Sequence, residues 1–215
     1  IRAFQVAETG PGVDTPDCLE RVRRLMAGLP EIEMAAKPSL ADVKLLITDV
    51  DGVLTDGGIY YDETGECLKR FHVRDGLGIR LLEESGIRVA VLSGRDSATL
   101  RKRVADLGVS LFRFGVKDKH QACVDLMAAA GVAANQTACI GDDTIDLPAF
   151  AACGLSYAVA DAPSYVQAKA TAVLQTAGGH GALRELADAI LMAQGKAAVF
   201  DSATGFAKVM AGAAQ

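Results

Sequence analysis

The sequence predicts an α/β protein with a doubly wound, Rossmann-like and mostly parallel sheet. From residue 43 onward, short apolar runs alternate with stretches of helical period. The turns between them are short, as they are in parallel βαβ units. Half of the residues are hydrophobic, only 5% are aromatic and Trp is absent, which favours an α/β composition over an aromatic-rich β-sandwich.

The elements follow in order along the chain. Each expected strand is a short apolar run that ends at turn or polar residues, and each expected helix repeats its apolar positions with helical spacing. Strands are expected at 43–48, 87–92, 110–114, 137–140 and 155–159, and helices at 77–84, 97–107, 120–130, 147–152 and 181–194.

One segment breaks this alternation directly after the first strand. In "IYYDETGECLKRF", residues 59–71, two β-prone runs flank "DETG", which has the composition of a hairpin turn. We therefore expect a β-hairpin that protrudes from the sheet.

Size, charge and cysteine content limit the class of protein. A chain of 215 residues forms one domain or two small ones, and a net charge of −5 with a pI near 5.2 argues against a nucleic-acid partner. The longest apolar runs are too short for a membrane span. Five cysteines without a CxxC pair indicate reduced thiols in a cytoplasmic protein: Cys18, Cys67, Cys123, Cys139 and Cys153.

Three regions are expected along the chain. Residues 1–42 contain "DTPDCLERVRRLM", a helical pattern with Thr15 as N-cap and Pro16 at the first helical position, followed by a linker around "MAAKPSL". Residues 43–196 form the α/β domain, and residues 197–215 form a tail.

The first candidate site is "LLITDVDGVLTDGG", where Asp49 and Asp51 follow a buried strand. The period of two places both carboxylates on one side, at the sheet edge where open parallel sheets bind ligands. Two carboxylates this close repel each other unless a proton or a cation intervenes. Ordinary turn aspartates are the alternative.

The second candidate site is "ACIGDDTIDLPAF", in which Asp142, Asp143 and Asp146 follow another buried strand. A cluster of hard oxygen ligands without His or Cys suits Mg²⁺ better than zinc. Helix N-capping is an alternative role for Asp143.

Two further strand ends carry polar groups that could hold an anion. "SGRD" places Ser93 and the amides of Gly94 and Arg95 where we expect a helix to begin. "FGVKDKH" places Lys117 and Lys119 after the next strand. Considered separately, Ser93 is an ordinary helix N-cap, and Lys117 and Lys119 are solvated surface residues. Together with the carboxylates, they fit a phosphate bound with Mg²⁺.

The motifs "DVDGVLTDG", "LSGR", "DK" and "GDDTIDLP" resemble, in order, the four motifs of the haloacid dehalogenase-type phosphohydrolases. With "GECLKRFHVRDGLGI", "GGHGALRELADAIL" and "AQGK", residues 43–196 resemble the capless 3-deoxy-D-manno-octulosonate 8-phosphate phosphatases, enzymes of lipopolysaccharide biosynthesis. In this sequence Ser93 stands where many relatives have Thr, and the hydroxyl is kept.

The resemblance implies a role for each candidate residue. Asp49 would be the nucleophile that forms an aspartyl-phosphate, and Asp51 the general acid and then the base. Ser93 and Lys119, rather than Lys117, would hold the transferring oxygens. Mg²⁺ would be bound by Asp49, Asp142 and the backbone carbonyl of Asp51, supported by Asp143 or Asp146.

The resemblance also implies how the site is closed and what it recognises. The intervals between the motifs leave no room for a cap domain, so a homotetramer in which hairpins 59–71 pack together would let a neighbouring subunit cover each site. Arg95 and Arg74 are candidates for binding the carboxylate of the sugar acid. An ion pair between Arg74 and Asp75 is the alternative.

Residues 1–26, around "PGVDTPDCLERVRRLM", resemble the carboxyl-terminal end of 3-deoxy-manno-octulosonate cytidylyltransferases. This suggests the phosphatase portion of a bifunctional protein. The alternatives are a phosphatase for nine-carbon, sialic-type ulosonate 9-phosphates, or a non-catalytic tetramerisation module behind a cytidylyltransferase. A receiver-type signalling domain is disfavoured because of the order of its motifs. In such a domain the acidic pair comes before the phosphorylated aspartate, which is the reverse of the order found here.

Overall fold

The computed structural model describes residues 38–200 of the chain. It contains the predicted parallel sheet, with six strands in the order β5-β4-β1-β6-β7-β8. The fold-class prediction is confirmed, and most strand limits differ from it by one or two residues. The strands are β1 Leu45–Thr48, β4 Arg88–Leu92, β5 Leu111–Arg113, β6 Thr137–Gly141, β7 Leu155–Ala158 and β8 Ala172–Val173.

Strand β1 lies in the middle of the sheet and is buried along its whole length. It pairs in parallel with β4 on one side and β6 on the other, so that Thr48 lies beside Val91 and Ile140. The residues that follow these three strands therefore leave the sheet at the same edge. This register brings three of the sequence motifs together.

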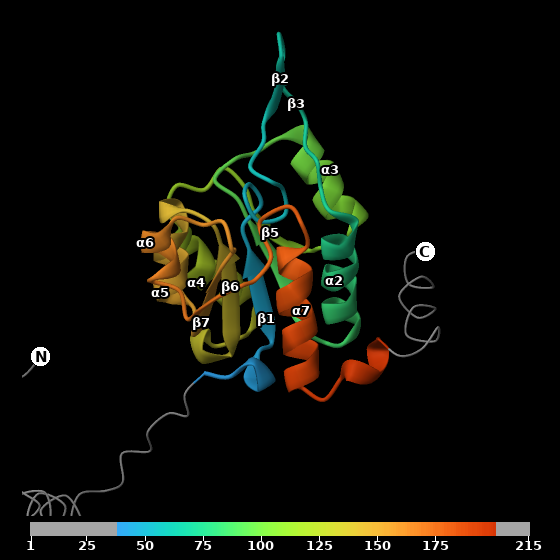
Figure 1. Ribbon diagram of the computed structural model, residues 1–215, viewed down its shortest axis with the longest axis vertical. Coiled ribbons are helices and arrows are strands. Elements are labelled where there is room, and N and C mark those ends of the chain that lie inside the picture. Colours follow the sequence, from blue (N-terminus) through green and yellow to red (C-terminus); the bar gives the residue numbers. More distant parts are fainter. Residues whose placement is uncertain (1–37, 201–215) are drawn as a thin grey trace, which may run out of the picture. The chain divides into compact units, whose positions relative to one another are not determined.

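Helices cover both faces of the sheet (Figure 1). Helices α2, α3 and α7 lie on one side, and α4, α5 and α6 on the other. Short 3-10 turns η1 Leu40–Asp42, η2 Ala134–Gln136, η3 Thr144–Asp146 and η4 Ala197–Val199 complete the fold. The helices are α2 Val73–Glu84, α3 Ala98–Asp106, α4 Lys119–Ala130, α5 Leu147–Ala152, α6 Ser164–Gln167 and α7 Ala182–Ala193.

Helix α2 begins four residues before its predicted start, and the reason is its two glycines. Gly76 and Gly78 have low helix propensity, which hid the first turn from the sequence prediction. A Cβ at Gly76 would lie 2.5 Å from Arg103 Nη2, and one at Gly78 would lie 3.3 Å from the Cα of Arg184 in α7. Close packing of α2 therefore outweighs the propensity of its residues.

The predicted hairpin is present. Strands β2 Tyr60–Asp62 and β3 Gly65–Leu68 pair antiparallel, and the Asp62 carboxylate accepts hydrogen bonds from the Thr64 amide and hydroxyl, both at 2.7 Å. Figure 1 shows this hairpin projecting away from the sheet and its helices. Its exposed side chains include Ile59, Tyr60, Tyr61 and Leu68.

Two small elements, α6 and β8, were missed by the sequence prediction because α6 is one turn long and β8 has two exposed residues. Within residues 38–200, no helix combines the length and apolar character needed to cross a membrane. The four described cysteines, Cys67, Cys123, Cys139 and Cys153, form no disulfide among residues 38–200. The expected amino-terminal helix, Cys18 and most of the tail lie outside the described residues.

Candidate active site

A buried ammonium group meets the first aspartate of the site. Asp49 follows β1, its amide donates to the Ile140 carbonyl at 3.1 Å, and it is 6% exposed. Lys119 is the first residue of α4, whose N-cap is Asp118, and it is 2% exposed. Its Nζ lies 2.9 Å from Asp49 Oδ2. Lys117 is exposed to solvent, so Lys119 is the lysine that reaches the carboxylates.

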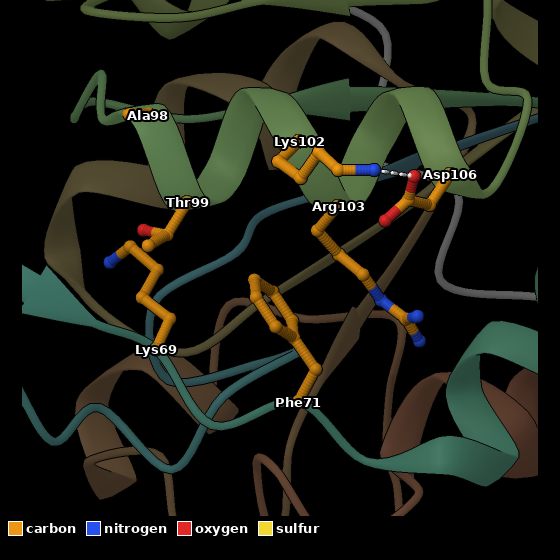
Figure 2. A pocket seen from close by; sticks show the side chains of 7 residues that line it. All are labelled: Lys69, Phe71, Ala98, Thr99, Lys102, Arg103 and Asp106. Carbon is orange, nitrogen blue, oxygen red and sulfur yellow. Dashed lines mark hydrogen bonds and ion pairs between the residues drawn. The ribbon is translucent and has the colours of Figure 1, made fainter.

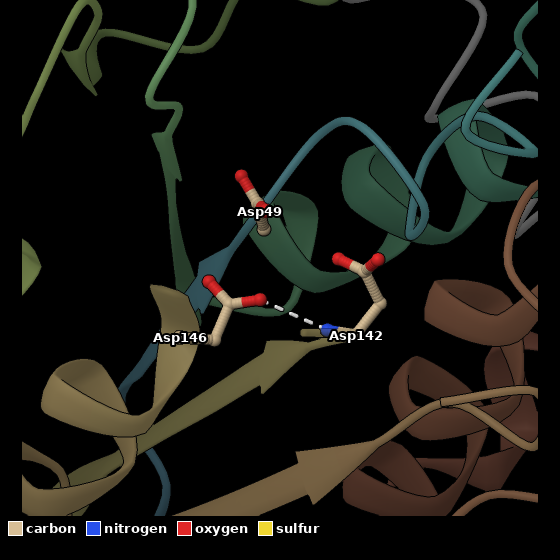
Figure 3. A group of neighbouring side chains, drawn as sticks. All are labelled: Asp49, Asp142 and Asp146. Carbon is tan, nitrogen blue, oxygen red and sulfur yellow. Dashed lines mark hydrogen bonds between the residues drawn. The ribbon is translucent and has the colours of Figure 1, made fainter. Parts of the chain in front are cut away.

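Asp49, Asp142 and Asp146 form a cluster in which one carboxylate oxygen from each lies within 4.8 Å of the others (Figure 3). Asp146 Oδ1 lies 2.6 Å from Lys119 Nζ, and its Oδ2 accepts hydrogen bonds from the Asp142 amide at 2.9 Å and the Asp143 amide at 3.3 Å. A Cβ at Gly141 would lie 2.5 Å from Asp146 Cβ, so a glycine is needed there. Asp146 thus connects Lys119 with the backbone amides of Asp142 and Asp143.

The electrostatics of the cluster call for a further cation. Burial, together with the charges of Asp49, Asp146 and Asp143, raises the pKa of Asp142 to about 8. Burial and Asp146 also raise the pKa of Asp49, against the opposing effect of Lys119. Burial lowers the pKa of Lys119, but the two carboxylates it faces raise it above its ordinary value overall. One ammonium therefore does not neutralise three carboxylates.

The donor set fits a magnesium ion. Asp142 Oδ1 is buried and has no hydrogen-bond partner among the described residues, so it is free to bind a cation. The cluster offers carboxylate oxygens, the hard ligands that Mg²⁺ prefers. The cluster also contains Asp146, which the prediction placed only in a supporting role. The Asp51 backbone carbonyl remains a predicted ligand.

Asp51 meets a second buried lysine that the sequence analysis did not identify. Lys69 follows β3, its side chain is wholly buried, and its Nζ contacts Asp51 Oδ1. In the sequence, Lys69 belongs to the second β-prone run of the predicted hairpin. Its one signal was a cation in a hairpin placed directly after the paired aspartates. The hairpin therefore contributes a side chain to the site as well as a surface.

The turn after Asp51 is held by a glycine loop from the other end of the chain. The Gly179 amide donates to the Val53 carbonyl at 2.8 Å. A Cβ at Gly178 would collide with the backbone oxygen of Gly52, and Asp161 Oδ1 accepts from the Gly178 amide at 2.9 Å. Close backbone packing explains the glycines of the "GGHG" sequence.

Ser93 follows β4 and is buried, but the expected helix start at this point is wrong. Ser93 Oγ accepts from the Arg95 amide at 3.1 Å, so this amide already has an acceptor. Helix α3 begins at Ala98, with Ser97 as the N-cap whose hydroxyl accepts from the Leu100 amide at 3.4 Å. The register of the sheet nevertheless places Ser93 at the same edge as Asp49.

The two candidate arginines have different environments. Arg95 Nη2 lies 3.0 Å from Glu66 Oε2 in the hairpin and 3.3 Å from the Tyr61 hydroxyl. Arg74 is exposed on the first turn of α2. The alternative ion pair of Arg74 with Asp75 is not formed: Asp75 Oδ1 accepts from the Arg184 amide at 2.9 Å, and its buried Oδ2 has no hydrogen-bond partner among residues 38–200.

Asp143 has the N-cap role considered as its alternative. Its carboxylate accepts from the Thr144 amide at 2.6 Å, and with Asp146 it forms a capping box. Asp143 therefore orients the turn that carries the cluster.

A pocket of about 440 Å³ lies between the hairpin stem and α3 (Figure 2). Arg103 lies over the Phe71 ring at 5.5 Å from its centroid. Lys69, whose Nζ contacts Asp51, is one of the residues that line the pocket. Its lining residues are Lys69, Phe71, Ala98, Thr99, Lys102, Arg103 and Asp106.

Comparisons with known proteins agree with this geometry. Residues 115–186 match the model of the haloacid dehalogenase-like hydrolases. The 3-deoxy-D-manno-octulosonate 8-phosphate phosphatase of Haemophilus influenzae is 63% identical over 169 residues, which cover 79% of this chain and 94% of that protein. The matched region therefore includes nearly the whole of this relative.

Solved structures show the same likeness. The cobalt-bound form of the Haemophilus influenzae phosphatase superposes with a TM-score of 0.76, covering 78% of this chain and 98% of that one. The Moraxella catarrhalis phosphatase, solved with a magnesium ion, a phosphate ion and a KDO molecule, is 38% identical with a TM-score of 0.72, covering 75% and 92%. The chain is thus a phosphoric monoester hydrolase, and it belongs to the 3-deoxy-D-manno-octulosonate 8-phosphate phosphatase family of haloacid dehalogenase-like hydrolases.

Proposed function

We propose that this chain hydrolyses 3-deoxy-D-manno-octulosonate 8-phosphate to the free sugar acid and inorganic phosphate. The observation that carries the proposal is the buried cluster of Asp49, Asp142 and Asp146 around Lys119, with Asp51 two residues beyond the first aspartate. The activity of the relatives named above supports the choice of substrate.

In the first step a carboxylate oxygen of Asp49 attacks phosphorus, and the bond from phosphorus to the sugar oxygen breaks. Asp51 gives its proton to the departing oxygen, so the sugar acid leaves as an alcohol. Lys119 and the Ser93 hydroxyl lie at the same edge and stabilise the charge on the transferring oxygens. The product of this step is an aspartyl-phosphate on Asp49.

In the second step Asp51 takes a proton from water, and the water oxygen attacks the phosphorus of the aspartyl-phosphate. The bond from phosphorus to Asp49 breaks, which releases phosphate and restores the carboxylate. Asp49, Asp142 and the Asp51 carbonyl would hold Mg²⁺, with Asp146 beside them. When bound, the ion supplies positive charge that offsets the carboxylates and the phosphoryl oxygens.

Recognition of the sugar acid is proposed to depend on Arg95, whose Nη1 has no contact to Glu66 and can donate hydrogen bonds to a carboxylate. Arg74 is the second candidate, at the first turn of α2. One hydroxymethyl group separates the eight-carbon substrate from the nine-carbon ulosonate 9-phosphates, which are the alternative. That difference is too small to be decided from the residues alone.

The assay that tests this proposal is phosphate release with Mg²⁺ from a panel of eight- and nine-carbon ulosonate phosphates. We expect the eight-carbon compound to have the highest kcat/KM and Asp49→Asn to abolish turnover. Asp125→Asn, an exposed position in α4, is the matched control. Undiminished turnover by the Asp49 variant would overturn the nucleophile. A folded but inactive wild type would favour a non-catalytic tetramerisation module.

The assembly is proposed to be a homotetramer in which hairpins β2–β3 pack together. The exposed apolar side chains of Ile59, Tyr60, Tyr61 and Leu68 support an occupied surface there. Sedimentation of the wild type against Tyr61→Lys would test it. Specific activity that stays constant as the tetramer dissociates would reject a site shared between subunits.

The bifunctional character remains a separate proposal. It depends on residues 1–26, which resemble the end of a cytidylyltransferase and lie outside the described residues. Sequencing the transcript upstream of Ile1 tests it directly. An upstream frame without a nucleotidyltransferase would reject the fusion and leave the phosphatase proposal intact.

A further inference from the structure

One carboxylate of the hairpin links two cations, Lys69, which contacts Asp51, and Arg95. Glu66 lies in β3 with a side chain 8% exposed, and its Oε1 is 3.2 Å from Lys69 Nζ. Its Oε2 accepts from Arg95 Nη2 at 3.0 Å and from Nε at 3.3 Å. Lys69 Nζ also contacts Asp51 Oδ1. Charged contacts therefore run without interruption from the proposed general acid to the candidate carboxylate-binding arginine.

These contacts are poorly explained by stability alone. The side chain of Lys69 is wholly buried, and taking an ammonium out of water costs about as much as its ion pairs return. An apolar side chain of the same length would fill the space beside Phe71 without that cost. A lysine also loses rotamer freedom when it is fixed. Its placement on Asp51 therefore points to the chemistry of the site.

The contact of Glu66 with Arg95 also points to the chemistry of the site rather than to stability. Two nitrogens of the guanidinium share one carboxylate oxygen, which fixes the plane of the fork and leaves Nη1 without a contact to Glu66. The Tyr61 hydroxyl restrains the same group from a second direction at 3.3 Å. An arginine held in this way can meet a substrate carboxylate with little further loss of entropy.

We propose that Lys69 and Glu66 are positioning residues of the phosphatase reaction. Lys69 holds the Asp51 carboxyl toward the leaving oxygen, and Glu66 sets the place of Arg95 relative to it. The inference rests on the proposed function and deepens it. It assigns to the hairpin stem the preference for alkyl phosphates that carry a remote carboxylate.

The leaving group provides the test of Lys69. p-Nitrophenolate departs without a proton, whereas the alkoxide of the sugar-acid phosphate needs one from Asp51. With Lys69→Met we expect kcat on the sugar-acid phosphate to fall about 10- to 100-fold, part of a general acid's contribution. On p-nitrophenyl phosphate the burst of p-nitrophenolate, which reports only the first step, should change in rate by less than about threefold, because Asp51 acts there only in the later hydrolysis of the aspartyl-phosphate. Lys69→Arg should recover part of the loss.

The matched control is Lys44→Met, an exposed lysine directly before β1 at the opposite edge of the sheet. Equal losses in kcat on the sugar-acid phosphate and in the rate of the p-nitrophenolate burst would show that Lys69 only supports the fold and would overturn the proposal. So would wild-type turnover of the sugar-acid phosphate by Lys69→Met.

Glu66→Gln keeps the shape of the side chain and removes its charge. We expect KM for the sugar-acid phosphate to rise about tenfold, which corresponds to about 1.4 kcal/mol of lost orientation of Arg95. KM for p-nitrophenyl phosphate, which has no carboxylate, should stay unchanged. A lower KM for the sugar-acid phosphate would overturn the proposal, since Glu66 would then compete with substrate for Arg95. Glu84→Gln, exposed at the end of α2, is the control.

Failure of the proposed substrate can be distinguished from failure of the proposed roles of Lys69 and Glu66. If the wild type hydrolyses another alkyl phosphate but no ulosonate phosphate, the proposed substrate is wrong. The leaving-group comparison with that alkyl phosphate then still decides the role of Lys69. A wild type that hydrolyses p-nitrophenyl phosphate and no alkyl phosphate would overturn both proposals.

Discussion

Lys119 and Asp49 form an ion pair that is almost wholly withdrawn from solvent. Nζ and Oδ2 lie 2.9 Å apart, and the two side chains are 2% and 5% exposed. The same ammonium lies 2.6 Å from Asp146 Oδ1. Because charges interact more strongly in a dry site than in water, this one group has a large effect on the energies of both carboxylates.

Lys119→Met should reduce kcat by about 10²–10³, the usual effect of removing a preorganised stabiliser of the transition state. It should also reduce the free energy of unfolding by about 3–5 kcal/mol in the absence of Mg²⁺, since two buried carboxylates lose their partner. Steady-state kinetics and urea unfolding measure the two effects. Lys117→Met, two residues earlier and exposed, should change neither. Similar behaviour of the two variants would contradict the assignment.

Magnesium should stabilise the protein more at pH 8 than at pH 5.5. The pKa of Asp142 is about 8 in the folded protein against 3.8 for the free group, so the folded state binds the extra proton. The contribution of Asp142 to the stability of the metal-free protein is therefore largest below about pH 4 and falls as the pH rises toward 8. Mg²⁺ binds the carboxylate form and opposes this loss.

At pH 8, Mg²⁺ at a hundred times its Kd adds about 2.7 kcal/mol, or roughly 5–10 °C in Tm. Thermal unfolding with and without the ion measures the effect, and Asp142→Asn should abolish most of it. A Tm increase that is equal or larger at pH 5.5 would show that the cluster does not bind the ion as carboxylates.

Asp146→Asn and Asp143→Asn should have separate effects although the residues lie three apart. Asp146 orients Lys119 and the Asp142 amide, so its variant should weaken Mg²⁺ binding about 10- to 100-fold. Asp143→Asn keeps a good N-cap and should bind Mg²⁺ normally, with unfolding changed by less than about 1 kcal/mol. Isothermal titration compares them, and a reversed order would contradict the cluster.

Gly178→Ala should lower kcat by about tenfold or more. Its Cβ would meet the Gly52 carbonyl and displace the turn that follows Asp51, and small misplacements of a reacting group cost rate steeply. Gly86→Ala is the control, because Gly86 has φ +79° but open space around it. It should lose about 1–2 kcal/mol of stability and keep its kcat. Normal kcat in the Gly178 variant would remove the loop from the mechanism.

The sequence predicted the sheet and one edge of the site well, because both depend on local patterns. Apolar runs located the five longer strands of the sheet, and the parallel arrangement then placed Asp49, Ser93 and Asp142 at one edge. The resemblance favours Lys119 over Lys117, and the fold gives the physical reason. Only the start of α4 turns one of them inward.

Other features depend on contacts between distant segments. Lys69 reaches Asp51 across 18 residues, and Arg184 approaches Gly78 from the last long helix. No local period records such contacts, so Lys69 was overlooked and α2 was predicted too short. Asp143 and Asp146 look alike in sequence. Only their hydrogen bonds show that Asp143 is an N-cap and that Asp146 belongs to the carboxylate cluster.

The two ends of the hairpin differ in the contacts that their side chains make. At the tip, the side chains of the Asp62–Gly65 turn are open to solvent or bonded only to one another. At the stem, Lys69 is enclosed and tied to Asp51. Substitutions in the turn should therefore have little effect on catalysis, whereas substitutions at the stem should reduce it. A library randomised at the turn should yield many active clones, and one randomised at Glu66 and Lys69 very few.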